Sequence, residues 1–408
     1  MADRNSALGA IVTGKTAREP YPMRRTARSP AKEDAAAERK PVSYRLIAPS
    51  EIGAVTAQWE DLAANAVEAN PFFAPFMLGP ALRHLGGERA RVLCVWSGEG
   101  PSPALAGLLP ITKAFGYARL PARFLQTWIY EHCFYGAPLV RRGAETEFFD
   151  GLCAFIDAEA PFGGFLRLPL VDCDGPVARA LCEAALPRRL VYAAGAFERA
   201  VLRGGYDAEA FMAANIGKER LKAMKRRRRR LSEVGALSFR VMGAGDDLEE
   251  WARLFIGLED SGWKGEAGTS FKSNPAHTEF LLETLRGARR AGALHFVRLD
   301  VGARAGAMLI ILGRAGEGYA FKICHDEAFA HYSPGVALEM ELLKALESMG
   351  PRDFVDSCAV PDHPMINALW PGRRRLAGYN IAGAGRASRA VLGLARRLER
   401  LGEWARGQ

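Results

Sequence analysis

One segment in the second half of the chain constrains the fold most. Residues 319–324 form an apolar strand pattern, a polar loop follows, and Ser333-Pro334-Gly335 opens a helical pattern over residues 336–349. In this order, backbone N–H groups at the helix start lack partners within the helix and carry the positive end of its dipole. Gly335 leaves the backbone bare, so a phosphate group can approach it. The segment predicts either an anion-binding turn or an ordinary loop-to-helix junction.

Length and composition indicate two packed domains in a soluble globular chain. The 408 residues are 49% hydrophobic, which is enough for two cores. The most apolar segments, residues 104–111 and 306–312, have the length of strands, so no membrane span is expected. The seven cysteines are odd in number and form no Cys-x-x-Cys pair, which argues against a disulfide framework and against a zinc site. A cytoplasmic location fits best.

The formal net charge of +9 comes mostly from one segment. Residues 218–230 hold nine cations and the single acid Glu219, which gives +8. Leu221, Met224 and Leu231 fall on one narrow stripe of a helix, and the cations cover the rest of its circumference. Such a helix suits a nucleic acid or other polyanion, an anionic cofactor, or a solvated position between domains. The pattern itself leaves these three interpretations open.

The second half predicts a mixed sheet with helices on its faces. Three strands separated by tight glycine-containing turns suit an antiparallel meander, and the Ser-Pro-Gly helix then crosses over to a parallel neighbour. The expected strands are residues 236–242, 293–299, 305–312, 318–324, 353–358 and 375–382, and the expected helices are residues 247–262, 274–291, 336–349, 364–369 and 387–405.

The first half repeats this order more weakly, which predicts two copies of one architecture. Where the Ser-Pro-Gly turn would fall, the chain reads Gly136-Ala-Pro-Leu-Val-Arg-Arg-Gly143, so this half is expected to shape the structure and the substrate site. The expected elements are strands at residues 43–47, 91–97, 104–111 and 165–171, and helices at residues 52–69, 81–85 (in part) and 145–158. The predicted divisions are a disordered basic tail over residues 1–42, domains over 43–205 and 206–385 with an Arg-rich helix at 215–233, and a basic C-terminal helix over 386–408.

The order of elements and several motifs resemble the GNAT N-acyltransferase fold, and in particular its CelD-like (BioF-like) branch. That branch is related to the FemAB peptidyltransferases, which carry two such folds in tandem. The resemblance covers about residues 215–379 and implies an α/β (mixed α+β) fold class, with tandem GNAT-like folds that are each a mixed, mostly antiparallel sheet flanked by helices. It rests on the basic helix, Leu258-Glu259, Trp263-Lys264, Lys322 with Asp326, and Tyr332-Ser-Pro-Gly335.

The resemblance implies acyl-coenzyme A as the co-substrate. No metal is expected, because the sequence has no His-Glu-x-x-His motif. In GNAT enzymes the pyrophosphate of this donor sits on a Gln/Arg-x-x-Gly-x-Gly/Ala turn, and the matching register here has Tyr332 in place of the cation. At residues 356–363 the glycine-rich turn and lysine of the pattern do not align. The implied donor site consists of Tyr332, Ser333, Pro334, Gly335, Val336, Ala337 and Leu338.

The implied chemistry moves an acyl group, expected to be acetyl, from a thioester to an amine. It needs a base for the ammonium proton and a backbone N–H for the oxyanion. His325 with Asp326 is the first candidate base, although His325 also fits a loop histidine without a task. Asp356 is a candidate for positioning the amine or a cap of the following turn. Glu259 is an alternative base or an ordinary helix-surface carboxylate.

Three further residues are expected to bind substrate. Trp263 is a candidate wall for the acyl chain, or more simply a packing residue at a helix end. Lys264 follows it directly, and Lys322 lies within a strand, where pairing with Asp326 would hold the loop in shape.

The expected function is acyl transfer to a small-molecule or glycan amine, with a role in polysaccharide or cell-envelope biosynthesis. Two alternatives stay open. One is a FemAB-like aminoacyltransferase with tRNA bound to residues 218–230. The other is a catalytically inactive, polyanion-binding component of exopolysaccharide or cellulose production.

Overall fold

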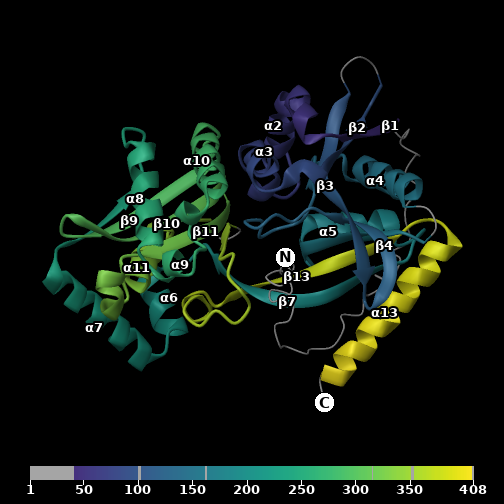
Figure 1. The fold of residues 1–408 in the computed structure, drawn as a ribbon. Helices are drawn as coiled ribbons and strands as arrows, with labels where there is room; N and C mark the ends of the chain where they lie inside the picture. The colour runs from purple at the N-terminus through teal and green to yellow at the C-terminus, as the bar shows by residue number, and fades with distance from the viewer. Residues whose placement is uncertain (1–40, 100–102, 161–162, 315, 351–352, 407–408) are drawn as a thin grey trace.

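The computed structural model describes residues 41–99, 103–160, 163–314, 316–350 and 353–406. Its strands join into one mixed sheet that runs through both halves of the chain (Figure 1). The strands are β1 (Val42–Ile47), β2 (Arg91–Ser97), β3 (Ala104–Tyr117), β4 (Leu120–Thr127), β5 (Leu139–Val140), β6 (Phe165–Asp172), β7 (Val191–Arg203), β8 (Leu237–Val241), β9 (Leu294–Val301), β10 (Arg304–Arg314), β11 (Glu317–His325), β12 (Phe354–Asp356) and β13 (Gly372–Ala382).

Helices cover both faces of this sheet. In the second half, α8 and α10 lie on one face, and α6, α7, α11 and α12 lie on the other. The helices are α2 (Thr56–Ala64), α3 (Pro75–His84), α4 (Glu145–Glu159), α5 (Pro176–Ala185), α6 (Ala208–Asn215), α7 (Lys218–Val234), α8 (Leu248–Asp260), α9 (Trp263–Glu266), α10 (Pro275–Arg290), α11 (Pro334–Ala345), α12 (Ile366–Leu369) and α13 (Arg386–Arg406). No helix among the described residues is both long and apolar enough to cross a lipid bilayer.

The two halves exchange strands at the centre of the sheet. The strand order is β1-β2-β3-β4-β6-β13-β7-β12-β11-β10-β9-β8, with β5 paired to β3. The last strand, β13, therefore lies between β6 and β7 of the first half, while β7 pairs with β12 of the second half. Each half contributes its sixth main strand to the sheet of the other. The described strand pairs are antiparallel except β4 with β6 and β11 with β12, which confirms the mixed, mostly antiparallel sheet.

Both halves contain the same order of elements, as two copies of one architecture require. Each runs strand, helix, helix, three strands, helix, strand, helix, strand, from β1 to β7 and from β8 to β13. The division at residue 205 stays a prediction, because the sheet is continuous and β13, assigned to the second domain, pairs with strands of the first half.

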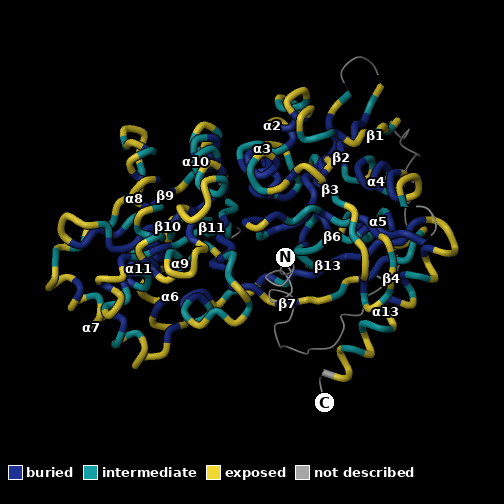
Figure 2. Tube along the Cα trace, viewed as in Figure 1, coloured by how far each residue is buried: buried dark blue, intermediate teal, exposed yellow. Residues whose placement is uncertain are grey.

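The buried residues also run through both halves (Figure 2). The larger core joins β2, β3, α3 and α4 of the first half to α8 and α10 of the second. Helix α10 packs against α3 across the junction. A Cβ atom on Gly287 would lie 2.7 Å from the Cβ of Phe76, so glycine allows the two helices their close approach.

The elements expected in the second half are confirmed to within three residues, except that α11 ends at Ala345 rather than at 349.

The first half departs more from expectation. The helix expected over 52–69 begins as a 3-10 helix, Pro49–Val55, and α2 ends at Ala64. The chain leaves the helix because Glu68 and Asn70 are buried against distant segments. Strand β4, helix α5 and strand β7 were not expected. The predicted tail lies almost wholly outside the described residues.

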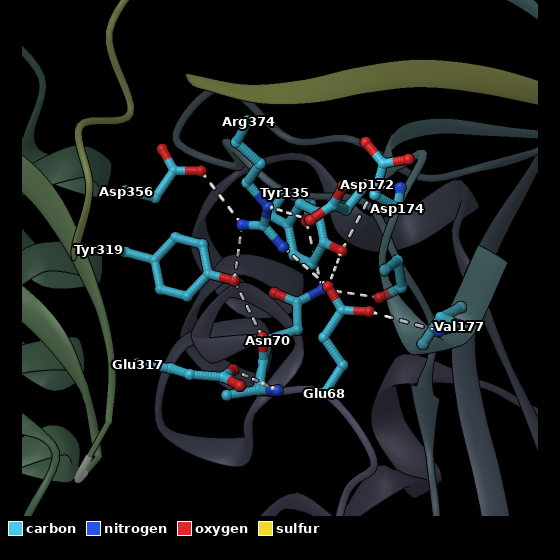
Figure 3. A network of polar contacts seen from close by, with 12 residues as sticks. Glu68, Asn70, Tyr135, Asp172, Asp174, Val177, Glu317, Tyr319, Asp356 and Arg374 are labelled. Carbon is cyan, nitrogen blue, oxygen red and sulfur yellow. Dashed lines mark hydrogen bonds and ion pairs between the residues drawn. The ribbon is translucent and has the colours of Figure 1, made fainter. Parts of the chain in front are cut away.

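A buried arginine links the two halves (Figure 3). The guanidinium of Arg374, in β13, lies 2.7 Å from Glu68, 2.8 Å from Asp172 and 3.1 Å from Asp356, and it donates to the Tyr319 hydroxyl at 3.2 Å. Each of its three nitrogens therefore has a carboxylate partner. Burial raises the pKa of Glu68, and the Arg374 charge opposes that shift. The pairing offsets the cost of placing these charges inside the protein.

Replacing Arg374 by methionine should lower the free energy of unfolding by about 3–5 kcal/mol, because the buried Glu68 and Asp356 and the partly buried Asp172 would lose this cation. Urea denaturation measures this change. Arg229→Met is the matched control, since Arg229 is exposed and its one ion pair among the described residues is with the exposed Glu233, at 3.6 Å. The control substitution should lower the free energy of unfolding by less than about 1 kcal/mol. Similar losses in both variants would contradict the importance of the buried network.

Candidate active site

The pairing of β11 with β12 ends early and leaves part of β11 open. The two strands run parallel, but only Glu317–Tyr319 pairs with Phe354–Asp356, whereas β11 continues to His325. The other edge of β11 carries a bulge, because Ile310 faces Lys322 while Ile311 faces Ala320. Bulges re-aim side chains and are frequent beside active sites. Beyond Tyr319, the edge of β11 on the β12 side is therefore free of a strand partner.

A pocket of about 220 Å³ lies on the α7 and α11 face of the sheet, and we call it the arginine pocket. The lining residues come from α7, from the start of α11 and from the region of α12. They are Arg220, Ala223, Met224, Arg227, Arg228, Tyr332, Ser333, Val336, Ala337, Met365 and Leu369. Four of the seven residues predicted to bind the donor line this pocket. Of the other three, Leu338 is fully buried in the core and Pro334 is buried.

The start of α11 offers fewer free amides than the sequence predicted. Ser333 has a left-handed backbone, with φ at 55°, and its side chain does not cap the helix. The N–H groups of Val336 and Ala337 already donate to the Ser333 carbonyl oxygen, at 3.0 and 3.2 Å. Within residues 333–337, which the structure describes in full, the Gly335 amide is the N–H without a partner. The expectation of several free amides is therefore wrong, and an anion here needs further donors.

Helix α7 supplies such donors. Met224 and Leu231 are buried, as the apolar stripe predicted. The helix packs against α11 and the 3-10 helix Glu327–Tyr332. Arg227 donates to the Ser333 hydroxyl at 3.2 Å, and Arg228 pairs with Glu341 of α11 at 2.7 Å. Cations of α7 therefore lie beside the turn before α11. At this turn Tyr332 occupies the position at which the GNAT pattern has a basic or amide residue.

A second pocket, of about 230 Å³, lies on the opposite face of β11 between the two halves, and we call it the lysine pocket. The loop after β4 forms one wall, and the connection from α8 to α10 forms another. The lining residues are Glu131, His132, Phe134, Glu259, Trp263, Lys264, Thr269, Phe271, His277 and Lys322. The pocket brings together Glu259, Trp263, Lys264 and Lys322, which the sequence had singled out.

Two of these predicted residues are paired with each other. Glu259 is 4% exposed, lies 2.6 Å from the Lys264 ammonium and accepts the Phe271 N–H at 3.0 Å. It is therefore not the surface carboxylate of the simpler interpretation. Trp263 is 63% exposed at the rim of the pocket, so its interpretation as a packing residue is wrong.

Lys322 has a different environment from the one expected. Its ammonium lies 5.3–5.6 Å from the ring centres of Phe134, Phe271 and Phe321. Burial, followed by the charge of Lys264, lowers the pKa of Lys322 to about 8. The expected pairing with Asp326 is absent, because Asp326 pairs with Arg304 and accepts the Ala328 N–H.

The other predicted catalytic residues lie outside both pockets. The His325 side chain is 37% exposed, and its Nε2 atom is 3.6 Å from Glu327. Asp356 is fully buried between Arg374 and Arg199, and it accepts the Cys358 N–H at 2.8 Å. Through this contact Asp356 caps the following turn, which was one of the two roles expected for it from the sequence.

Three titratable residues of the lysine pocket, Glu131, His132 and His277, were not predicted from the sequence. The potential ligand atoms of Glu131, His132 and His277 lie within 4.8 Å of one another, and the Nε2 atom of His277 is 3.5 Å from Glu131. His132 is 6% exposed, and neither of its ring nitrogens has a partner among the described residues. Burial, with the charge of Lys322, lowers the pKa of His132 well below its usual value. Only folding brings His277 to the loop after β4, so no local pattern could reveal the group.

Residues 218–358 match the family model described as an acetyltransferase (GNAT) domain. A search of curated proteins finds no match.

Two solved structures share the fold across most of the chain. A conserved protein of unknown function from Bacteroides thetaiotaomicron VPI-5482 aligns with a TM-score of 0.50 at 9% identity, covering 80% of this chain and 96% of that one. FemX aligns with a TM-score of 0.50 at 7% identity, covering 84% of this chain and 98% of that one. At these identities the likeness concerns the fold alone. Residues 218–358 thus match a GNAT acetyltransferase domain, within a fold that most of the chain shares with FemX.

Proposed function

We propose that the protein transfers an acyl group, acetyl in the simplest case, from acyl-coenzyme A to an amine. The observation that carries the proposal is the position of the two pockets on opposite faces of β11, where its pairing with β12 has ended. A thioester entering from the arginine pocket can meet an amine in the lysine pocket at this open edge. We extend the proposal to amines of polysaccharide or cell-envelope biosynthesis.

The donor's phosphates would lie against the start of α11. The Gly335 amide and the helix dipole favour an anion there, and Arg220 and Arg227 line the same pocket. Arginine forms strong, directional hydrogen bonds with phosphate oxygens. In this proposal, α7 replaces the cation that the family pattern has at the position of Tyr332.

The reaction needs a base and an oxyanion donor. The amine nitrogen attacks the thioester carbonyl carbon, the carbon–sulfur bond breaks, and the amine proton passes to the base. We assign the base to His277, because it lines the lysine pocket, its side chain is 18% exposed, and Glu131 can orient it. A backbone N–H on the open edge of β11 would hold the oxyanion.

A second candidate function is FemAB-like aminoacyl transfer from tRNA. Arg226, Arg229 and Arg230 favour it, because they are exposed and do not line the arginine pocket. Salt-dependent retention of tRNA, without stabilisation by acetyl-coenzyme A, would support this function. Binding of neither ligand, together with glycan affinity, would support an inactive polyanion-binding component.

Arg227→Gln should weaken acetyl-coenzyme A binding about tenfold, since a charge-assisted hydrogen bond to phosphate would be lost. Calorimetric titration at low and moderate salt measures the affinity and its salt dependence. Arg229→Gln is the control on the same helix, because Arg229 does not line the pocket. An equal loss in both variants would point to general attraction by α7 rather than to this site.

Gly335→Val should remove the stabilisation that acetyl-coenzyme A gives the wild-type protein. A Cβ atom at this position meets only Ile323, at 3.9 Å, so the fold can accept it, while the valine would crowd the free amide. At a donor concentration of 100 Kd, the wild type should gain about 2.7 kcal/mol in a thermal shift experiment. Gly393→Val, in an open position on α13, is the matched control. Unchanged stabilisation of Gly335→Val would reject the donor site.

His277→Gln should reduce kcat by roughly 100-fold with donor affinity retained, as expected for loss of a general base. Steady-state release of free thiol measures turnover. His325→Ala tests the base expected from the sequence, and it should keep most of its activity because His325 lines neither pocket. The reverse result would assign the base to His325.

A further inference from the structure

Lys322 is a cation of the lysine pocket that has no direct ion pair among the described residues, although the charges of Glu259 and the exposed Glu131 act on it from a distance. No carboxylate of the described residues lies within 4 Å of its ammonium, whereas the neighbouring Lys264 is paired with Glu259 at 2.6 Å. The fold itself directs Lys322 into the pocket. The bulge in β11 makes Phe321 an extra residue, so Phe321 and Lys322 both face the side of the sheet where the pocket lies.

The surroundings of Lys322 make an unpaired ammonium costly. Phe134 from the first half and Phe271 from the second enclose it beside Phe321. Ring faces compensate only part of the lost hydration of a lysine ammonium. An anionic group of a ligand would supply the missing partner, and the low polarity of the walls would strengthen that pairing.

We propose that the lysine pocket binds an acceptor that carries a carboxylate in addition to its amine, and that Lys322 holds the carboxylate. One unpaired cation matches the single charge of a carboxylate better than the charge of a phosphate. The inference rests on the proposed acyl transfer for the role of the amine, but the carboxylate site can be tested separately.

A divalent cation on Glu131, His132 and His277 is the competing interpretation of the same pocket. The positive charges of Lys322 and Lys264 both act on His132 and would repel such an ion. The observations therefore favour an anionic ligand, and the metal becomes an outcome of the test.

The first experiment compares a series of ω-amino carboxylates of two to six carbons with their methyl esters, using acetyl-coenzyme A as donor. The wild-type protein should prefer the carboxylate by about tenfold or more in kcat/KM, as expected for a charge-assisted contact. Lys322→Gln should lose this preference, Lys322→Arg should keep part of it, and the exposed Lys113→Gln should leave it unchanged. Acetyl-coenzyme A affinity should stay constant in all variants. Equal use of acids and esters by the wild type would overturn the proposal.

A binding experiment keeps the inference testable if no amine is acylated. Butanoate and methyl butanoate are titrated into the wild-type protein without donor and followed by protein NMR. Butanoate should bind more tightly than its ester, and its affinity should fall above about pH 8, because Lys322 then loses the proton that gives it charge. Absence of turnover with butanoate binding intact would contradict the acyl transfer but not the carboxylate site. Loss of butanoate binding on dialysis against EDTA, with recovery on adding Zn²⁺, would replace the carboxylate site by a metal site.

Discussion

The ion pairs of Arg374 are the interaction on which the arrangement of the two halves depends. The residue lies in β13, which enters the sheet between β6 and β7, and its partners come from three separate segments: the chain after α2, the end of β6 and the end of β12. Charges buried this deeply are tolerated only when each has a partner. We interpret the network as a constraint on how the exchanged strands align, because a shift of β13 by one residue would carry Arg374 to the other face of the sheet.

The same network lies at the base of the candidate active site. Asp356 binds Arg374 at the point where the pairing of β12 with β11 ends. Tyr319, the last residue of β11 that pairs with β12, donates to the backbone carbonyl oxygen of Ala69 through its hydroxyl. The end of pairing is thus held by contacts from both halves. Beyond it, β11 has a free edge with a pocket on either face, which is the geometry that a reaction between two separately bound substrates needs.

The two halves differ at the helix that follows the third strand of each meander. In the second half, α11 begins with Pro334 and Gly335 and faces the arginines of α7. In the first half, α4 begins after Ala144 and carries Glu145 and Glu147 in its first turn, which disfavours an anion. The first half instead contributes the loop after β4 to the lysine pocket. The structural and substrate-shaping role expected for the first half stays a prediction.

The local sequence pattern was sufficient to predict those elements whose structure depends on residues close together in the chain. The meander, the Ser-Pro-Gly helix start and the apolar stripe of α7 follow from strand alternation, turn residues and helical period, so the sequence by itself determined the fold class and the position of the turn before α11. Only the tertiary structure decided the strand exchange, because β7 and β13 carry no signal of which half they will join. It also decided the composition of the lysine pocket, where His277 and Lys322 meet a loop of the other half. Such groups form through contacts between residues far apart in the chain. These contacts produce no helical or strand periodicity in the local sequence, so the sequence alone does not reveal them.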